Sequence, residues 1–246
     1  MRAVYLFPNL LTSANLFCGV LAICRVLSWN GNPASPEPLL EAGWLIFLAM
    51  VLDLFDGLVA RFFRATSEFG VQFDSLSDFL SFGVAPSLLV YRAFLADLGH
   101  SGRFGVGLAF LYITFVALRL ARFNTQAEAG EKSDFAGLPC PLAAGLLVST
   151  TQTLLRLEWG GVARIVIPFL GILLSILMIS TVTYPALSTL QGHRKKPGIY
   201  ILGVVGALIA LVLLWEGALM IGFGAYIFYN LFRSLGRRMS PGREKP

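Results

Sequence analysis

The chain has 246 residues, of which 56% are hydrophobic and 13% are charged, and its mean hydropathy is +0.73. Such a composition is typical of an integral membrane protein and excludes an ordinary soluble domain. The net charge of +5 comes from basic residues scattered over several connections without an accompanying aromatic surface, so nucleic acid is not an expected partner.

A helix that spans a membrane needs about 20 mainly apolar residues. Eight apolar segments that could form such helices follow one another with short connections: 10–28, 41–60, 71–95, 104–122, 138–156, 162–183, 198–215 and 217–233. We therefore expect an all-α, polytopic transmembrane helical bundle of about eight helices. It would be a single integral membrane domain over residues 1–246, with six helices within 1–183, two additional C-terminal helices within 198–233 and a basic tail over 234–246.

The distribution of Lys and Arg predicts the orientation of these helices. The connection Trp29–Glu41 contains neither residue, whereas the tail over 234–246 is basic. With the N-terminus inside, the cytoplasmic side also receives Arg2, Arg61, Arg64, Arg119, Arg122, Lys132, Arg194, Lys195 and Lys196. The positive-inside rule then places both termini in the cytoplasm. We expect an integral protein of the cell (cytoplasmic) membrane, with its basic residues near anionic head groups. The three cysteines lie in apolar runs without metal-ligand spacing, and we expect buried free thiols.

Four aspartates interrupt two of the apolar segments: Asp53 and Asp56 in one, Asp74 and Asp78 in the next. A carboxylate at the bilayer centre costs about 2.5–3.5 kcal/mol on insertion scales, so these side chains must face a cavity, a partner or a metal rather than lipid. Each helical residue advances about 100°, so the two members of each pair project from one stripe. A polar turn over 61–67 would return the second helix beside the first, and all four carboxylates would converge at one depth.

An acidic cluster without nearby His or Cys offers only oxygen ligands, which suit hard divalent cations such as Mg²⁺ or Mn²⁺. Such ions usually bind together with substrate phosphates. Gly57 and Ala60 share the stripe of the first acidic pair, and Gly70 lies on the facing helix, so a ligand could approach the backbone there. Arg61 and Ser67 would stand at the cytoplasmic mouth as phosphate or base contacts. The alternative is that the small residues serve only helix packing.

The residues from Asp53 to Asp78 form the pattern D-x-x-D-G-x-x-A-R-x8-G-x3-D-x3-D, which resembles the full signature of the CDP-alcohol phosphotransferases. The segments 7–19, 74–78, 81–86, 119–124 and 135–139 also resemble the membrane-embedded phosphatidylserine synthase branch of that family. The likeness extends to about residue 145, and the last helices are generic.

This resemblance implies a reaction. In such enzymes the acids hold two divalent cations, Mn²⁺ or Mg²⁺, that bridge the diphosphate of CDP-diacylglycerol. Carried onto this chain, Asp53, Asp56 and Asp74 would be ligands, and Asp78 would be both a shared ligand and the general base that takes the proton of the L-serine hydroxyl. The alkoxide would attack the phosphorus that carries diacylglycerol and release CMP. The catalytic core would be the six helices within 1–183, its site would face the cytoplasm, and related enzymes tend to be homodimers.

The resemblance also implies contacts to the lipid substrate. Gly57, Arg61 and Ser67 match positions that contact the nucleotide and its phosphates in the family. Asn9, Thr12 and Asn15 on the first helix would face the same cavity, with Asn9 and Thr12 at CDP-diacylglycerol. Alternatively, Pro8–Asn9 only begins the first helix.

A zwitterionic acceptor such as serine needs a cation for its carboxylate, and Arg119, Arg122 and Asn124 are the candidate serine contacts. The two arginines could equally mark the cytoplasmic boundary of their helix. A sibling enzyme that uses glycerol 3-phosphate, inositol phosphate or choline remains the rival within the same chemistry. A cation-coupled transporter is the rival from another class, although no counterpart of the acidic cluster follows residue 140.

Overall fold

The computed structural model describes residues 6–63, 67–98, 102–128, 137–180, 182 and 216–239. Its main elements in chain order are α1 (Leu6–Ser28), α2 (Glu37–Phe63), α3 (Glu68–Asp78), η2 (Phe79–Val84), α4 (Ala85–Val90), η3 (Tyr91–Leu95), α5 (Arg103–Glu128), α6 (Cys140–Arg156), α7 (Gly160–Ile179) and α9 (Glu216–Met239). No strand occurs among the described residues, and the prediction of an all-α membrane protein is confirmed.

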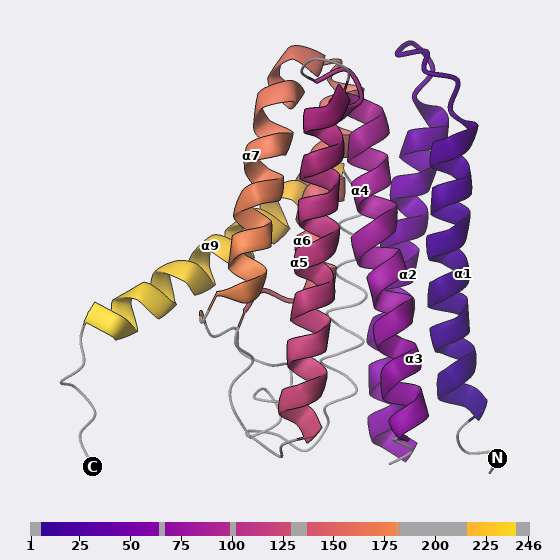
Figure 1. The fold of residues 1–246 in the computed structure, drawn as a ribbon, viewed down its shortest axis with the longest axis vertical. Helices are drawn as coiled ribbons and strands as arrows, with labels where there is room; N and C mark the ends of the chain where they lie inside the picture. The colour runs from indigo at the N-terminus through magenta and orange to yellow at the C-terminus, as the bar shows by residue number, and fades with distance from the viewer. Residues whose placement is uncertain are drawn as a thin grey trace.

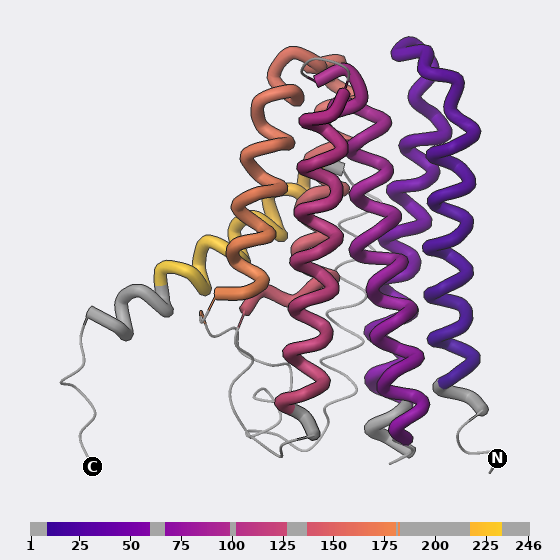
Figure 2. Tube along the Cα trace, in the orientation of Figure 1, coloured from indigo at the N-terminus to yellow at the C-terminus, as the bar shows by residue number. Residues whose placement is uncertain are grey.

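Helices α1 to α5 and α7 run up and down beside one another, and α9 runs obliquely from behind α7 away from the bundle (Figure 1). Helix α1 packs against α2 and α3, α5 packs against α7, and α6 packs against α7 and α9. The tube in Figure 2 shows that α1 begins, α2 ends and α3 begins at the same end of the bundle, at the bottom of the view. We call this the site end, because α2 and α3 carry the four aspartates close to it.

Five helical stretches are long and apolar enough to cross a membrane: Asn9–Ser28, Glu37–Val59, Glu68–Leu95, Arg103–Gln126 and Gly160–Ile179. They correspond to the first four predicted segments and the sixth. Helix α6 contains 17 residues and fills the place of the fifth. The predicted segment 198–215 lies outside the described residues, and α9 covers the segment 217–233.

The third spanning stretch is not the uniform α-helix that its apolar sequence predicted. Two wider π-helical turns, η2 and η3, interrupt it on either side of α4. Pro86 lacks a backbone N–H and would clash with a carbonyl in the preceding α-turn, and the wide turn of η2 ends just before it. The Ser87 hydroxyl donates to the Gly83 carbonyl oxygen at 2.8 Å. Single π-turns within α-helices are frequent at functional sites, and η2 begins directly after Asp78.

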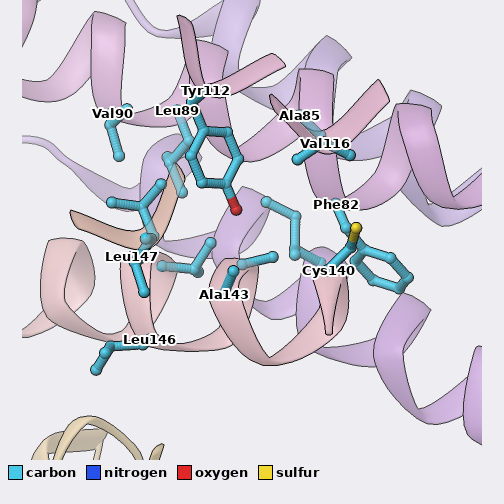
Figure 3. Packing of buried hydrophobic residues seen from close by; sticks show 14 of the residues in the cluster. Phe82, Ala85, Leu89, Val90, Tyr112, Val116, Cys140, Ala143, Leu146 and Leu147 are labelled. Carbon is cyan, nitrogen blue, oxygen red and sulfur yellow. The ribbon is translucent and has the colours of Figure 1, made fainter. Parts of the chain in front are cut away.

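The core of the bundle lies where α4, α5 and α6 meet. Figure 3 shows Tyr112 and Val116 of α5 facing Cys140 and Ala143 of α6, all of them buried. Small residues on α6 allow close packing, since a Cβ at Gly145 would lie 2.8 Å from the Phe223 ring of α9.

Outward-facing surfaces of the spanning helices carry exposed large apolar side chains, among them Phe17, Phe110 and Phe169, as expected for surfaces that contact lipid. The expectation of buried thiols holds for Cys18 and Cys140 but is wrong for Cys24, which is exposed on the outer side of α1. An apolar run in a membrane helix does not by itself distinguish an inward from an outward position.

Candidate active site

Three of the four predicted aspartates form a compact cluster at the site end. Asp53 comes from α2, and Asp74 and Asp78 come from α3. One carboxylate oxygen of each lies within 4.8 Å of the chosen oxygens of the other two. Asp53 and Asp74 are half-buried, whereas Asp78 is only 9% exposed. The antiparallel helices α2 and α3 therefore bring Asp53 close to Asp74 and Asp78, as predicted for three of the four carboxylates.

Asp56 does not join this cluster. It is buried one turn further along α2, where the Thr12 hydroxyl of α1 donates a hydrogen bond to its Oδ2. Asp56 still lies close enough to Asp53 and Asp74 to interact with both electrostatically. Asp53, Asp74 and Asp78 thus form a triad, and Asp56 lies beside it. Helix α1 orients Asp56 through Thr12.

Asp78 is approached from two further helices. The Asn15 carboxamide nitrogen on α1 donates to Asp78 Oδ1 at 3.2 Å. The Arg119 guanidinium on α5 is close enough to act on Asp78 electrostatically. The Arg119 side chain also donates from Nη1 to the Cys140 sulfur at 3.6 Å, which links α5 to the beginning of α6. Asp78 is thus the acidic residue at which α1, α3 and α5 come together.

Helix α1 is held against α3 and η2 by two hydrogen bonds to its backbone. The Ser77 hydroxyl donates to the Thr12 carbonyl at 3.2 Å, and the Ser81 hydroxyl donates to the Asn15 carbonyl at 3.1 Å. Gly19 continues the same contact, because a Cβ at that position would overlap the Ser81 hydroxyl oxygen. Small and polar residues that allow backbones to approach are typical of membrane helix interfaces.

The predicted phosphate contacts lie where α3 begins. Ser67 is the N-cap of α3, and its hydroxyl accepts a hydrogen bond from the Gly70 backbone N–H at 3.0 Å. A Cβ at Gly70 would lie 3.1 Å from this hydroxyl and 3.7 Å from Asn9 Oδ1, so Asn9 is close by. Gly57 is exposed on α2. Arg61 belongs to the last turn of α2, and its side chain lies outside the described residues.

The three candidate serine contacts on α5 do not converge. Arg119 acts on Asp78 electrostatically, but the Arg122 guanidinium donates to the Ile179 carbonyl at 3.1 Å, at the C-terminal end of α7. The Asn124 side chain donates to the Ser75 hydroxyl at 2.9 Å and connects α5 to α3. Of the three residues, Arg119 is the one that acts electrostatically on an aspartate of the cluster.

The donor set of the cluster can be compared with what a metal requires. Asp53, Asp74 and Asp78 offer carboxylate oxygens alone, the ligand type that Mg²⁺ and Mn²⁺ prefer. Their oxygens are near enough to one another to share an ion. The cluster could therefore bind a divalent metal ion, and its chemistry matches the predicted cofactor.

Residues 5–228 match the family model described as CDP-alcohol phosphatidyltransferase. The chain belongs to this family. The predicted resemblance is thereby confirmed. CDP-alcohol phosphatidyltransferases use divalent metals, in agreement with the oxygen ligands of the aspartate cluster.

Curated relatives are similar along much of the chain. The chain is 34% identical over 238 residues to the CDP-diacylglycerol–serine O-phosphatidyltransferase of Helicobacter pylori (strain ATCC 700392 / 26695), covering 96% of this chain and 93% of that protein. It is 35% identical to the enzyme of the same name from Bacillus subtilis (strain 168), covering 77% and 91% of the two chains. An archaetidylserine synthase of Methanothermobacter thermautotrophicus is 36% identical, covering 72% and 69%.

Proposed function

We propose that this membrane protein transfers the phosphatidyl group of CDP-diacylglycerol to the hydroxyl group of L-serine, which gives phosphatidylserine and CMP. The observation that carries the proposal is the similarity to a relative named for this reaction over 96% of the chain. The structure supports the proposal independently, since three acidic side chains from two membrane helices lie close enough together to share the metal ion that a metal-assisted phosphoryl transfer needs.

The aspartates would provide the metal site. Asp53, Asp74 and Asp78 are the nearest to one another, and Asp56 adjoins them. In our proposal these four carboxylates hold two divalent cations, Mg²⁺ or Mn²⁺. When bound, the cations neutralise charge on the transferring phosphoryl group and stabilise the departing phosphate.

Asp78 would act as the general base. The serine hydroxyl gives its proton to the Asp78 carboxylate, and its oxygen forms a new bond to the phosphorus that carries diacylglycerol. The bond between that phosphorus and the bridging oxygen breaks, and CMP leaves with the electron pair. The hydrogen bond from Asn15 to Asp78 Oδ1 fixes the orientation of the carboxylate for this proton transfer.

In our proposal, different residues contact the two substrates. For CDP-diacylglycerol we propose Gly57, Arg61, Ser67, Asn9 and Thr12. The proximity of Asn9 to the beginning of α3, and of Thr12 to Asp56, supports the two members on α1.

For serine we propose Arg119, Arg122 and Asn124. Arg119 is the best placed of the three, because its guanidinium is near Asp78, where the hydroxyl would react. Arg122 and Asn124 have hydrogen-bond partners on α7 and α3, so their contribution would require these contacts to be shared or exchanged.

The proposal includes the placement of the protein. It would be one integral domain of the cytoplasmic membrane over residues 1–246, with a catalytic core in 1–183, two further helices in 198–233 and a cytoplasmic tail over 234–246. The site end would face the cytoplasm, which the basic residues near that end support. We also propose a homodimer, which size analysis of the detergent-solubilised protein would test.

A phosphorylated acceptor is less well supported than serine. Glycerol 3-phosphate or inositol phosphate would require several clustered cations for its phosphate. Within the described part of the chain, the basic group that acts on Asp78 is Arg119. Neither the family nor these relatives support a transporter.

The decisive experiment offers the purified protein CDP-diacylglycerol and Mn²⁺ with radiolabelled serine, glycerol 3-phosphate, inositol phosphate or choline in separate reactions. We expect CMP release that depends on serine and is abolished in Asp78→Asn. Turnover of another alcohol with none of serine would assign the protein to a sibling activity. Failure of every acceptor, together with passage of labelled cations into proteoliposomes, would overturn the enzymatic proposal.

A further inference from the structure

Two residues that act on Asp78 each carry a buried polar atom that has no hydrogen-bond partner. They are the carboxamide oxygen Oδ1 of Asn15 and the guanidinium nitrogen Nε of Arg119. Asn15 is 0% exposed. Buried polar atoms in folded proteins are nearly always paired, and leaving one unpaired is costly. Two such atoms, on residues that act on the same carboxylate from two helices, indicate groups that a ligand satisfies.

The two atoms have opposite hydrogen-bonding character. Asn15 Oδ1 on α1 is an acceptor, and Arg119 Nε on α5 is a donor. Helix α3, which carries Asp78, packs against both α1 and α5. A ligand with its reacting hydroxyl at Asp78 would therefore meet an acceptor on the α1 side and a donor on the α5 side. An amino-acid zwitterion complements both, since its ammonium donates and its carboxylate accepts.

Neighbouring polar groups are engaged elsewhere. The hydroxyl hydrogens of Ser77 and Ser81 point to carbonyl oxygens of α1, and the Thr12 hydroxyl donates to Asp56. The amide nitrogen of Asn15 donates to the reacting carboxylate of Asp78. This hydrogen bond also sets the direction in which the amide oxygen of Asn15 points. Asn15 is thus held in a fixed orientation.

We propose that Asn15 Oδ1 accepts a hydrogen bond from the α-ammonium of the acceptor serine, while Arg119 binds its carboxylate. The amino and hydroxyl groups of serine are on adjacent carbons, so an ammonium near Asn15 keeps the hydroxyl at Asp78. This inference rests on the proposed function and extends it, because it assigns to the first helix a role in acceptor selection. Hydrogen-bonding sites for a substrate NH group reject analogues that lack the group far more strongly than apolar pockets do.

The test compares three acceptors that differ in one group at a time: serine, 3-hydroxypropionate without the ammonium, and ethanolamine without the carboxylate. The variant Asn15→Leu removes the amide at similar volume. We expect kcat/KM for serine to fall about 10- to 100-fold more than kcat/KM for 3-hydroxypropionate, as for loss of a hydrogen bond to a charged group. In Arg119→Gln, the ratio of kcat/KM for serine to kcat/KM for ethanolamine should fall instead.

The ratio between acceptors separates binding from positioning. Loss of the contact between Asn15 and Asp78 alone would lower turnover of all three acceptors equally, and that result would overturn the inference. Asn15→Asp keeps an acceptor oxygen and should retain the preference for serine over 3-hydroxypropionate. Ser87→Ala is the matched control, because it removes a buried hydrogen bond within the third span that involves no residue of α1, and the ratio should not change.

Folding and the underlying activity are controlled separately. Each variant is first tested for thermal stabilisation by CDP-diacylglycerol with Mn²⁺, and Asn15→Ala is measured in parallel so that the comparison survives misfolding of the leucine variant. If the unchanged protein does not use serine, the proposed function itself fails. If it uses serine and neither Asn15→Leu nor Asn15→Ala alters the ratio between acceptors, only the present inference fails.

Discussion

Close docking of α1 against η2 should make Gly19 intolerant of a side chain. In Gly19→Ala, the added Cβ would overlap the Ser81 hydroxyl oxygen and lie 3.1 Å from the Ser81 Cα. The hydroxyl could rotate away only by giving up its hydrogen bond to the Asn15 carbonyl, and the backbone atom could yield only if the two helices moved apart. Both responses disturb the contact that orients Asn15 and Thr12.

The expected loss of stability in Gly19→Ala can be judged against a glycine whose added Cβ would meet no neighbouring atom. A Cβ added at Gly107 on α5 would meet no atom within 4 Å, so Gly107→Ala gains the helix propensity of alanine, about 1 kcal/mol, without a clash. Gly19→Ala gains the same propensity but suffers overpacking of about 1–3 kcal/mol. At this chain length each kcal/mol corresponds to about 2–4 °C in Tm. Taking about 2 kcal/mol, the Tm of Gly19→Ala should lie about 4–8 °C below that of Gly107→Ala.

Thermal unfolding of both variants in the same detergent measures this difference, and CMP release under the assay conditions above measures its effect on the site. We expect Gly107→Ala to retain full activity and Gly19→Ala to lose activity along with stability. Adding Ser81→Ala to Gly19→Ala removes the overlapping hydroxyl and should recover part of the lost Tm. A Gly19→Ala protein that is as stable as Gly107→Ala would show that α1 and η2 are not in close contact.

Three further predictions concern the site. Thr12→Val removes the hydroxyl that orients Asp56, and we expect the Mn²⁺ concentration for half-maximal activity to rise about 10- to 100-fold. An unchanged Mn²⁺ dependence would contradict a metal role for Asp56. Cys140→Ala removes the acceptor of the Arg119 hydrogen bond, so KM for serine should rise several-fold while KM for CDP-diacylglycerol stays constant. An equal rise of both KM values would indicate a general packing defect. Chelation should abolish CMP release, and titration with Mn²⁺ or Mg²⁺ should restore it; activity that persists after exhaustive chelation would exclude a metal at Asp53, Asp74 and Asp78.

The convergence of Asp53 with Asp74 and Asp78 could be predicted because lipid forbids the alternatives. Carboxylates in apolar helices must face inward, and a short turn fixes their relative depth. The separate position of Asp56 could not be predicted in the same way. It lies about 60° around α2 and about 4.5 Å along it from Asp53, and which neighbour fills that place depends on the docking of α1. The sequence contained Thr12 but no indication of its register against α2.

Arg119, Arg122 and Asn124 show that residues close together in the sequence need not contact the same ligand. Arg119 and Asn124 differ by about 140° around α5, so one small ligand would not meet both from the same face of the helix. Arg122 differs from Arg119 by about 60°, yet its partner is the Ile179 carbonyl, at the end of a distant helix in the sequence. Similarly, Pro86 alone did not reveal η2, because membrane helices accommodate proline in several ways.

Helix α1 supplies no aspartate, yet its register determines how two of them are presented. Ser77 and Ser81 are four residues apart and therefore lie on one face of the third span, with Asp78 beside that face. Their hydroxyls hold the backbone of α1 at Thr12 and Asn15, and the side chains of these same two residues contact Asp56 and Asp78. A shift of α1 by a single residue would break both backbone contacts and withdraw both side chains from the carboxylates at once. Because the four contacts are coupled through one rigid helix, α1 is part of the site although it provides none of the acidic ligands.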